Sequence, residues 1–465
     1  MTKALFTLDA VLEATGGRAQ DVEASEINSI SIDSRELGPD ALFVAIKGDR
    51  FDGHDFVDTA LANGAVAALV SEGNGKGKGR IVVQDALGGL RDLARAARQR
   101  NRGFIVGVTG SVGKTTTKEA LRTIFEAAGQ THASIKSFNN HWGVPLTLAR
   151  LPESAQFGVF EMGMNAPDEI RPLSQMVRPH VAVITAVAPV HLEGLGSTEA
   201  IARAKAEIFD GLEPGGTAVL NADHQHLTQL MDAAKAAGVA NIVTYGFSRG
   251  VDWQILDAQS AGEQSFATIQ HAGERFAMTF AIPGRHMLSN ATAALAVAHL
   301  AGVSPEEGLR ALAGLRAQAG RGQRRPLGPA EKPLVLINES YNANPVAVSA
   351  ALSVFADVDA PGGRKVLVLG DMLELGDQAE ALHAGLNEAV RASGATRVHL
   401  VGPHMAALAA ALPAALVASH FRTAEEAEDV IIADLAYGDA VMIKGSNGVG
   451  LSRIVNALVA RFEHS

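Results

Sequence analysis

Short apolar segments that end in polar or glycine residues recur along the second and third parts of this chain, with helical spacing between them. They are 104-FIVGV-108, 157-FGVFEMG-163, 181-VAVITAV-187, 334-LVLINES-340, 365-KVLVLGDM-372, 397-RVHLVG-402 and 440-AVMIKGS-446. Apolar strands alternating with helices are typical of parallel sheets covered on both faces. Such sheets bind ligands beyond the carboxyl ends of their strands. We therefore predict an α/β protein whose functional residues follow these segments.

The composition and charge of the chain exclude several classes of function. The chain has 465 residues, of which 47% are hydrophobic, enough for about three domains. A net charge of −10 argues against nucleic-acid and acidic-membrane partners. The absence of cysteine excludes disulfides, thiolate nucleophiles and cysteine-ligated zinc. The acidic, amphipathic start is unlike a signal peptide, and the apolar stretch 405–418 is shorter than a membrane span and contains Pro413, so we expect a cytoplasmic monomer with no membrane insertion.

Two composition breaks divide the chain. The first combines a Gly/Lys loop, 73-GNGKGKGR-80, with a basic helical connector, 91-RDLARAARQRNRG-103. The second, 320-GRGQRRPLGPAEKP-333, has the Gly, Pro and Arg content of a linker. The predicted domains are therefore 1–102, 103–328 and 329–465.

The segment 104-FIVGVTGSVGKTTTKEAL-121 joins a strand to a helical pattern through a glycine-rich turn. Phosphate binding requires converging backbone N–H groups, a helix N-terminus and a lysine charge. Gly110 and Gly113 allow the turn, Lys114 can reach the outer phosphates, and Thr115 can hold Mg²⁺. The outer glycine of the usual pattern is replaced by Val108, which belongs to the strand. We predict a phosphate loop in which Gly110, Ser111, Val112, Gly113, Lys114, Thr115 and Thr116 bind nucleotide.

Three residues further along the chain are open to two interpretations. Glu161 ends the second strand, where a carboxylate is the usual second anchor for Mg²⁺, although a strand-end glutamate alone is more often solvated. His191 follows the third strand, and Lys205 lies in the helical pattern 201-IARAKAEIFDGL-212. The pattern alone favours a structural or surface histidine and an exposed lysine.

Together these segments resemble the Mur ligase family of ATP-dependent amide ligases. The phosphate loop lacks the outer glycine, as in that family, and the resemblance continues through Glu161, the HLEG segment at His191, AKAEIF at Lys205, 284-GRHMLSNATAAL-295, Gly320-Arg321 and 339-ESYNANP-345. The segments 31-SIDSRELGPDALFVAIKGDRFDGHDF-56, 137-SFNNHWGVPLTL-148 and 369-LGDMLELG-376 are similar to the branch that adds D-alanyl-D-alanine to UDP-N-acetylmuramoyl-tripeptide in peptidoglycan precursor synthesis. The resemblance covers essentially the whole chain.

The resemblance implies an architecture and a set of roles. It implies a small N-terminal α/β domain for the UDP-sugar, a central P-loop ATPase domain and a Rossmann-like C-terminal domain for the dipeptide. The implied catalytic residues are Lys114, Lys205, Glu161 and His191, with Thr115, Glu161, His191 and Lys205 as ligands of two Mg²⁺ ions. Lys205 matches a lysine that reacts with CO₂, and its carbamate would supply two hard oxygens to magnesium.

The remaining implied positions concern the substrates. Asn290, Arg321 and Glu339 match ATP-contacting positions, although the family usually has Asp where this chain has Glu339. Ser34, Asp49, Arg50 and Phe51 match positions that hold the UDP-sugar in a sibling enzyme, and Asn139 and Asn140 are further candidates for substrate binding. Lys444, Gly445, Ser446 and Asn447 follow a strand, where they contact the dipeptide or form an ordinary turn.

Three other functions are compatible with a phosphate loop. A folylpolyglutamate-synthase-like ligase shares the loop and the chemistry, but SYNANP and the 31–56 segment oppose it. A P-loop kinase or NTPase switch would not explain the Lys205 segment or a separate C-terminal domain. A non-catalytic nucleotide-binding module is opposed by the presence of the expected metal and phosphate residues.

Overall fold

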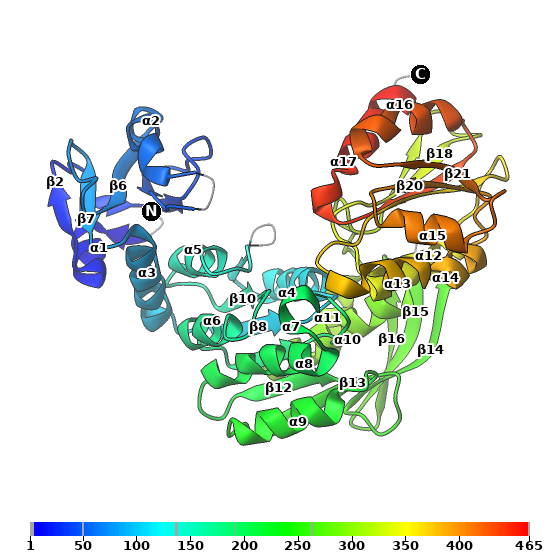
Figure 1. Ribbon diagram of the computed structural model, residues 1–465. Coiled ribbons are helices and arrows are strands. Elements are labelled where there is room, and N and C mark those ends of the chain that lie inside the picture. Colours follow the sequence, from blue (N-terminus) through cyan, green and yellow to red (C-terminus); the bar gives the residue numbers. More distant parts are fainter. Residues whose placement is uncertain (1–3, 49–50, 135–137, 191, 262–263, 464–465) are drawn as a thin grey trace.

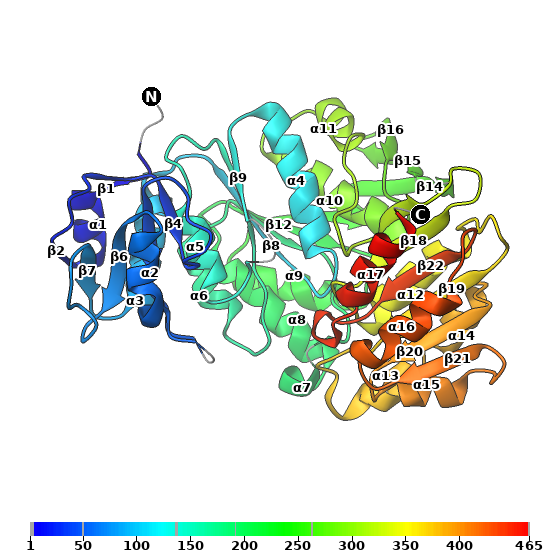
Figure 2. The same cartoon turned by 90° about the horizontal axis from the view of Figure 1, so that it is seen from above.

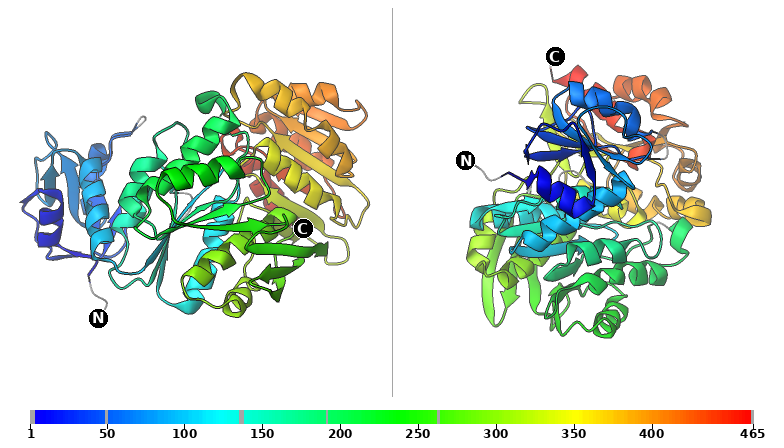
Figure 3. Two further views of the ribbon diagram at one scale, coloured as in Figure 1. Left: turned by 90° about the horizontal axis from the view of Figure 1, so that it is seen from below. Right: turned by 90° about the vertical axis from the view of Figure 1, so that its left-hand side faces the viewer.

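The computed structural model describes residues 4–48, 51–134, 138–190, 192–261 and 264–463. Its elements form three regions that follow one another along the chain, each with its own sheet. The middle region lies between the other two in Figure 1, and the same order is visible from above in Figure 2 and from below in Figure 3. Among the described helices, none combines the length and apolar character that a membrane crossing requires.

The first region contains a five-stranded sheet with the order β2-β7-β6-β5-β4, in which the β2–β7 pair is antiparallel and the other pairs are parallel. Leu69 and Ile81 of this sheet pack with Leu90 and Leu93 of α3 in one core. The elements are β1 (Phe6–Thr7), α1 (Leu8–Thr15), β2 (Arg18–Gln20), β3 (Glu26–Ile27), β4 (Ser29–Ser31), β5 (Ala41–Val44), η1 (Gly53–Phe56), α2 (Val57–Ala62), β6 (Ala65–Ser71), β7 (Arg80–Val83) and α3 (Ala86–Arg100).

The middle region contains a nine-stranded sheet with the order β16-β15-β14-β13-β12-β11-β8-β10-β9. The predicted strands at 104, 157 and 181 are β8, β10 and β11, and they pair in parallel as predicted. The elements are β8 (Phe104–Thr109), α4 (Lys114–Ala128), β9 (Thr131–Ala133), α5 (Gly143–Ala149), β10 (Phe157–Glu161), α6 (Ile170–Val177), β11 (Val181–Ile184), α7 (Leu192–Leu195), α8 (Thr198–Ala206), η2 (Glu207–Gly211), β12 (Thr217–Asn221), α9 (Leu227–Ala236), β13 (Asn241–Gly246), β14 (Trp253–Ala261), β15 (Gln264–His271), β16 (Glu274–Phe280), α10 (Arg285–Leu300) and α11 (Pro305–Leu312).

The third region contains a six-stranded sheet with the order β17-β18-β22-β19-β20-β21, parallel except for the β17–β18 pair. The four predicted strands are β18, β19, β20 and β22. The elements are β17 (Gln323–Leu327), β18 (Leu334–Glu339), α12 (Pro345–Ala356), β19 (Lys365–Gly370), η3 (Gly376–Gln378), α13 (Ala379–Ala384), α14 (Asn387–Ala392), β20 (Arg397–Val401), α15 (Met405–Ala411), β21 (Val417–Phe421), α16 (Ala424–Asp434), β22 (Ala440–Lys444), η4 (Asn447–Val449) and α17 (Ser452–Phe462).

The segment predicted as a linker, 320–333, is only partly one. Its residues Gln323–Leu327 form β17, which pairs with β18 over the register Gln323↔Asn338 to Leu327↔Leu334. The segment therefore forms a strand although its Gly, Pro and Arg content is typical of a linker. Pro326 is compatible with this strand because β17 lies at the edge of the sheet, where the missing backbone N–H of a proline leaves no partner unsatisfied. A boundary at 328/329 would separate β17 from its own sheet.

Candidate functional site

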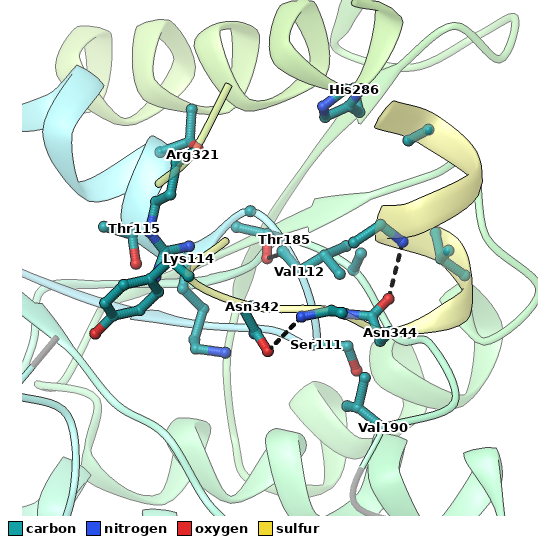
Figure 4. Close-up of a pocket in the computed structure, with 18 of the residues that line it drawn as sticks. Ser111, Val112, Lys114, Thr115, Thr185, Val190, His286, Arg321, Asn342 and Asn344 are labelled. Carbon is teal, nitrogen blue, oxygen red and sulfur yellow. Dashed lines mark hydrogen bonds between the residues drawn. The ribbon is translucent and has the colours of Figure 1, made fainter. Parts of the chain in front are cut away.

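A cleft of about 880 Å³ lies between the middle and third regions. One wall is formed by the loop after β8 and by the ends of neighbouring strands, and the other by segments that follow β18, β19 and β22. Figure 4 shows Ser111, Val112, Lys114 and Thr115 near Asn342 and Asn344, which precede α12. The carboxyl ends of two parallel sheets therefore face each other across one cavity, as expected for ligand sites in such sheets.

The loop from Gly110 to Gly113 is held by contacts that leave no room for side chains at either glycine. Gly110 has φ 152° and Gly113 has φ 86°. A Cβ at Gly110 would lie 1.9 Å from Oγ1 of Thr185, and one at Gly113 would lie 2.4 Å from Oδ1 of Asn290. Ser111 ties the loop to the segment after β11, because its Oγ donates to the carbonyl of Ala188 over 3.0 Å.

Lys114, the first residue of α4, is at the centre of the loop. Its Nζ donates to the carbonyl of Gly110 over 2.6 Å, so the ammonium group closes the loop from inside. Burial lowers the pKa of Lys114, and the nearby carboxylate of Glu161 partly offsets this. A partly buried ammonium at the wall of a cleft is suited to bind an anion such as a phosphate.

Thr115, Asn139 and Glu161 form an oxygen-rich corner next to the loop. The hydroxyl of Thr115 donates to Oε2 of Glu161 over 3.0 Å, and Nδ2 of Asn139 donates to Oε1 over 2.8 Å. Glu161 is only 1% exposed. Among the described residues no group of three or more His, Cys, Asp or Glu side chains could hold a metal. The corner nevertheless offers a buried carboxylate and a hydroxyl, which are hard ligands that fit Mg²⁺.

Lys205 is buried, contrary to the reading of its helical pattern alone. It lies in the last turn of α8. Ser197 caps the N-terminus of this helix, because its Oγ accepts from the backbone N–H of Ala200 over 3.2 Å. Its relative exposure is 2%. Burial and the neighbouring Lys114 ammonium hold the pKa of Lys205 well below its ordinary value. Both effects disfavour the charged form of this lysine.

The opposite wall contributes two paired groups. Nζ of Lys444 donates to Oε2 of Glu339 over 3.1 Å and to the carbonyl of Asn342 over 3.0 Å. Arg321 lies over the ring of Tyr341, with its guanidinium carbon 4.4 Å from the ring centroid. All five residues line the cleft, so the predicted positions Arg321 and Glu339 face the loop from the third region.

The structure separates the other predicted residues. Gly110, Lys205, Ser34, Phe51 and Asn140 are outside the lining of the cleft. Ser34 is buried in the first region, and Phe51 is 74% exposed. Asn140 accepts from the backbone N–H of Gly143 over 2.9 Å at the start of α5. The predicted positions Asp49, Arg50 and His191 lie outside the described residues.

Several cleft residues were missed from sequence. Thr185 donates to the carbonyl of Val112, and Asn221 donates from Nδ2 to the carbonyl of Thr185 over 2.9 Å. Thr185 directly follows β11, and Asn221 is the last residue of β12. This position at the end of a parallel strand is the one sequence feature that could have identified them. Arg285 lies over the ring of Phe247, with its guanidinium carbon 3.8 Å from the centroid. Arg285 belongs to the segment 284–295 that carries the family resemblance, but Phe247 lies in a segment with no motif.

Comparison with known proteins agrees with this geometry. Family models for the Mur ligase catalytic domain, the Mur ligase middle domain and the Mur ligase glutamate ligase domain match residues 26–98, 108–298 and 320–447. A UDP-N-acetylmuramoyl-tripeptide–D-alanyl-D-alanine ligase of Bacillus subtilis is 34% identical over 94% of both chains.

Solved structures are similar over nearly the whole chain. MurF from Acinetobacter baumannii matches with a TM-score of 0.86 and 29% identity, covering 98% of this chain and 99% of that one. MurF ligase from Thermotoga maritima in complex with ADP matches with a TM-score of 0.78 and 26% identity, covering 93% and 97%. The chain belongs to the Mur ligase family.

Proposed function

We propose that this chain is an ATP-dependent amide ligase that joins D-alanyl-D-alanine to UDP-N-acetylmuramoyl-tripeptide. One observation carries the proposal: a complete phosphate loop and an oxygen-rich corner face a second α/β wall across a single cleft. A ligase needs a nucleotide and an acceptor side by side, whereas a nucleotide switch needs no second wall. The names of the full-length relatives support this substrate pair.

The reaction makes a carboxylate into an electrophile. A carboxylate oxygen of the tripeptide attacks the γ-phosphorus, ADP leaves, and an acyl phosphate forms. The dipeptide amine then attacks the acyl carbon, phosphate leaves, and the amine releases its proton. Lys114 neutralises charge on the phosphates, and Arg321 adds a second positive charge from the facing wall. Closure of the two walls over the cleft would exclude water, which would hydrolyse the acyl phosphate.

The oxygen-rich corner would hold Mg²⁺ through Thr115 and Glu161, with His191 completing the set. Bound magnesium would neutralise the charge that develops on the transferred phosphoryl group. Asn139 orients the Glu161 carboxylate through its 2.8 Å hydrogen bond. ATP as the nucleotide is supported by the relative crystallised with ADP.

Lys205 has the surroundings that carbamate formation requires. A neutral amine attacks CO₂, and burial together with Lys114 lowers the pKa of Lys205 toward that form. The product is an anion, which would replace the repulsion between the ammonium groups of Lys205 and Lys114 by an attraction. We therefore propose a carbamylated Lys205 as a magnesium ligand.

The three regions would divide the substrates between them. We propose that the first region, near residues 1–102, binds the UDP-sugar through Ser34, Asp49, Arg50 and Phe51, with Asn140 beside the approach of the peptide. The middle region would bind ATP, and the third would bind the dipeptide. The pairing of β17 favours a boundary before Gln323 rather than after 328. We further propose a cytoplasmic monomer, since ATP and the UDP-linked precursor are cytoplasmic.

The test is phosphate release from ATP by the purified protein. UDP-N-acetylmuramoyl-tripeptide carrying lysine or meso-diaminopimelate as its third residue is supplied with and without D-alanyl-D-alanine. We expect release that requires both substrates and a product heavier by one dipeptide in mass spectrometry. Release that ignores both substrates would assign the loop to another nucleotide enzyme.

A further inference from the structure

The segment that follows β19 forms part of the third region's wall of the cleft and has no regular secondary structure. Its residues Leu373 and Leu375 line the cleft, and Leu373 is 41% exposed although it is large and apolar. A helix or a sheet satisfies its own backbone N–H groups, whereas an irregular segment depends on other partners for them. The position of this wall therefore depends on the groups that bind its backbone.

Two side chains bind backbone N–H groups of this segment. The N–H of Leu373 donates to Oγ of Ser446 over 3.0 Å. The N–H of Met372 donates to Nε2 of His383 over 2.9 Å. Ser446 lines the cleft itself, whereas His383 lies in α13, outside the cleft lining, and is 0% exposed. His383 therefore contacts the wall from behind, through its backbone.

The two ring nitrogens of His383 have different partners, and these partners determine its tautomer. Nδ1 lies 2.6 Å from the carbonyl oxygen of Ala379, so Nδ1 carries the hydrogen and donates it. Nε2 faces the N–H of Met372, so Nε2 offers its lone pair. Burial lowers the pKa of His383, and the hydrogen bond to Ala379 and the carboxylate of Asp371 partly offset this effect. The ring is thus neutral and presents a single acceptor to the segment.

Both ends of the segment are held by other elements. At its start, Oδ1 of Asp371 accepts from the backbone N–H of Met405 over 2.9 Å. At its end, a Cβ added to Gly376 would lie 3.2 Å from Cα of Glu193, so η3 packs against α7 of the middle region. Figure 1 shows α13 on the side of the third region that faces the middle region. His383 therefore holds the stretch between two fixed points.

The connection of this segment to the nucleotide side of the cleft is weaker. Oγ of Ser446, which accepts from Leu373, donates to the carbonyl of Ala343 over 3.4 Å. The preceding residue, Asn342, lines the cleft together with Lys114 of the phosphate loop (Figure 4). A displacement of the segment would move Leu373 directly, but it would reach the nucleotide side only through this long hydrogen bond. A ligand that contacts Leu373 should therefore be affected more than the nucleotide.

We propose that His383 is a positioning residue for D-alanyl-D-alanine, because through Met372 it holds Leu373 where the methyl groups of the dipeptide pack. The inference rests on the proposed function and adds a residue that positions its second substrate. Methyl groups bind favourably to an exposed apolar side chain because apolar surface leaves water. A gap of about 0.5–1 Å already removes about a quarter to a half of the dispersion attraction, so a small shift of the wall weakens binding.

The test compares His383→Leu with His383→Gln in the full-length enzyme. Leucine offers no acceptor to the N–H of Met372, so the KM for D-alanyl-D-alanine should rise at least about tenfold. The KM values for ATP and UDP-N-acetylmuramoyl-tripeptide should stay within about twofold. Glutamine can place Oε1 where Nε2 of the histidine lies, so it should restore the dipeptide KM to within about threefold of wild type.

Three outcomes of this comparison would overturn the inference. They are an unchanged dipeptide KM in His383→Leu, an equal rise for all three substrates, and a glutamine variant as impaired as the leucine variant. Wild-type phosphate release that ignores D-alanyl-D-alanine would overturn the proposed function instead, so the two failures are distinguishable.

His399→Leu is the matched control for the loss of a buried histidine. His399 is 1% exposed in β20 of the same region, and its ring nitrogens contact Ser419 and Asp434 outside the cleft lining. The control should lower the melting temperature as His383→Leu does but leave the dipeptide KM unchanged. A similar rise of the dipeptide KM in His399→Leu would show that any destabilisation of this region has the effect, and would overturn the positioning role.

A measurement on wild type covers the case in which His383→Leu does not fold. In protein labelled with ¹⁵N-histidine, the ring signals that His383→Gln lacks should show hydrogen on Nδ1 and none on Nε2 at pH 7. They should shift when D-alanyl-D-alanine is added to enzyme that already holds a non-hydrolysable ATP analogue and UDP-N-acetylmuramoyl-tripeptide. Hydrogen on Nε2, or signals that ignore the dipeptide, would overturn the inference.

Discussion

The hydroxyl of Thr115 donates a hydrogen bond over 3.0 Å to Oε2 of Glu161, although the two residues are 46 positions apart. They meet because β8 and β10 are parallel neighbours, with Glu161 opposite Val108 in the register. Thr115 lies in the first turn of α4 just beyond one strand, and Glu161 is the last residue of the other. The hydrogen bond thus holds together the two side chains that we propose as magnesium ligands.

The first prediction concerns the charge of this corner. Glu161→Gln retains the shape of the side chain but removes its charge, so Mg²⁺ should bind much more weakly. We expect kcat to fall by about 100-fold or more, since electrostatic stabilisation of the transition state is lost. Titration of activity with Mg²⁺ checks the cause, because a higher Mg²⁺ requirement is expected. Equal Mg²⁺ dependence in variant and wild type would contradict a metal role for Glu161.

The second prediction concerns the turn of the phosphate loop. Gly113→Ala places a methyl group against Asn290 at a positive φ of 86°, so the loop must open and ATP binding should fall at least about 100-fold. Gly250→Ala is the matched control: its φ is 78°, but a Cβ there meets nothing within 4 Å. Both variants carry the backbone strain, and only the first should lose nucleotide affinity in calorimetry. Similar affinities would show that steric contact with Asn290 is unimportant.

Much of this site could be predicted from sequence because it depends on local pattern. The phosphate loop and the strands β8, β10 and β11 are short-range features, and parallel pairing brings their carboxyl ends together. The burial of Lys205 was invisible to the pattern, since it arises from packing of α8 within the fold and a helical lysine is ordinarily exposed. The family resemblance drew attention to Lys205 through its implied role, but it did not predict that the side chain is buried.

The other features that the sequence did not predict depend on contacts between segments that are distant in the chain. The strand β17 lies in a segment with linker composition, and its edge pairing with β18 could not be read locally. The antiparallel extension β14–β16 likewise follows the parallel strands without a motif. The Arg285–Phe247 stack joins two segments that are adjacent only in three dimensions. The polar strand end at Asp371 was a candidate for chemistry, yet it accepts from the backbone N–H of Met405 over 2.9 Å at the start of α15.

The third prediction tests the carbamate at Lys205. Lys205→Ala should lose most activity, and small carboxylates added to the assay should partly restore it by supplying the missing oxygens. Lys235→Ala, at the exposed end of α9, should have no effect. Wild-type protein equilibrated with ¹³C-labelled bicarbonate should show a carbamate resonance in NMR that is missing from Lys205→Ala. Failure of rescue while ATP still binds, together with no labelled resonance, would refute the carbamate.

The fourth prediction concerns the ion pair between Glu339 and Lys444. Lys444 is only 2% exposed. Glu339→Ala leaves the Lys444 ammonium unpaired in the interior, so the free energy of unfolding should fall by about 3 kcal/mol. Adding Lys444→Met removes the stranded charge, and the double variant should recover much of that loss. Urea unfolding of the wild type, the two single variants and the double variant provides the four free energies of a double-mutant cycle. Strict additivity of the two single effects would mean that the pair contributes nothing as a pair.

The fifth prediction concerns the pH dependence of stability. Burial lowers the pKa of His132 from 6.5 to about 4, and its neutral ring donates from Nε2 to the carbonyl of Thr147 over 2.7 Å. Below pH 6.5 the unfolded chain takes up a proton that the folded chain excludes until about pH 4, so His132 lowers stability as the pH falls through this window.

His132→Gln retains a hydrogen-bond donor but cannot take up the proton. Its free energy of unfolding should therefore fall less steeply with acidification than that of wild type, by up to about 1.4 kcal/mol per pH unit between these two values. Both tryptophans, Trp142 and Trp253, lie in the middle region with His132, so their fluorescence during urea unfolding at pH 7, 6 and 5 reports on the relevant part of the chain. Parallel pH profiles for the two proteins would mean that His132 is protonated equally in the folded and unfolded states.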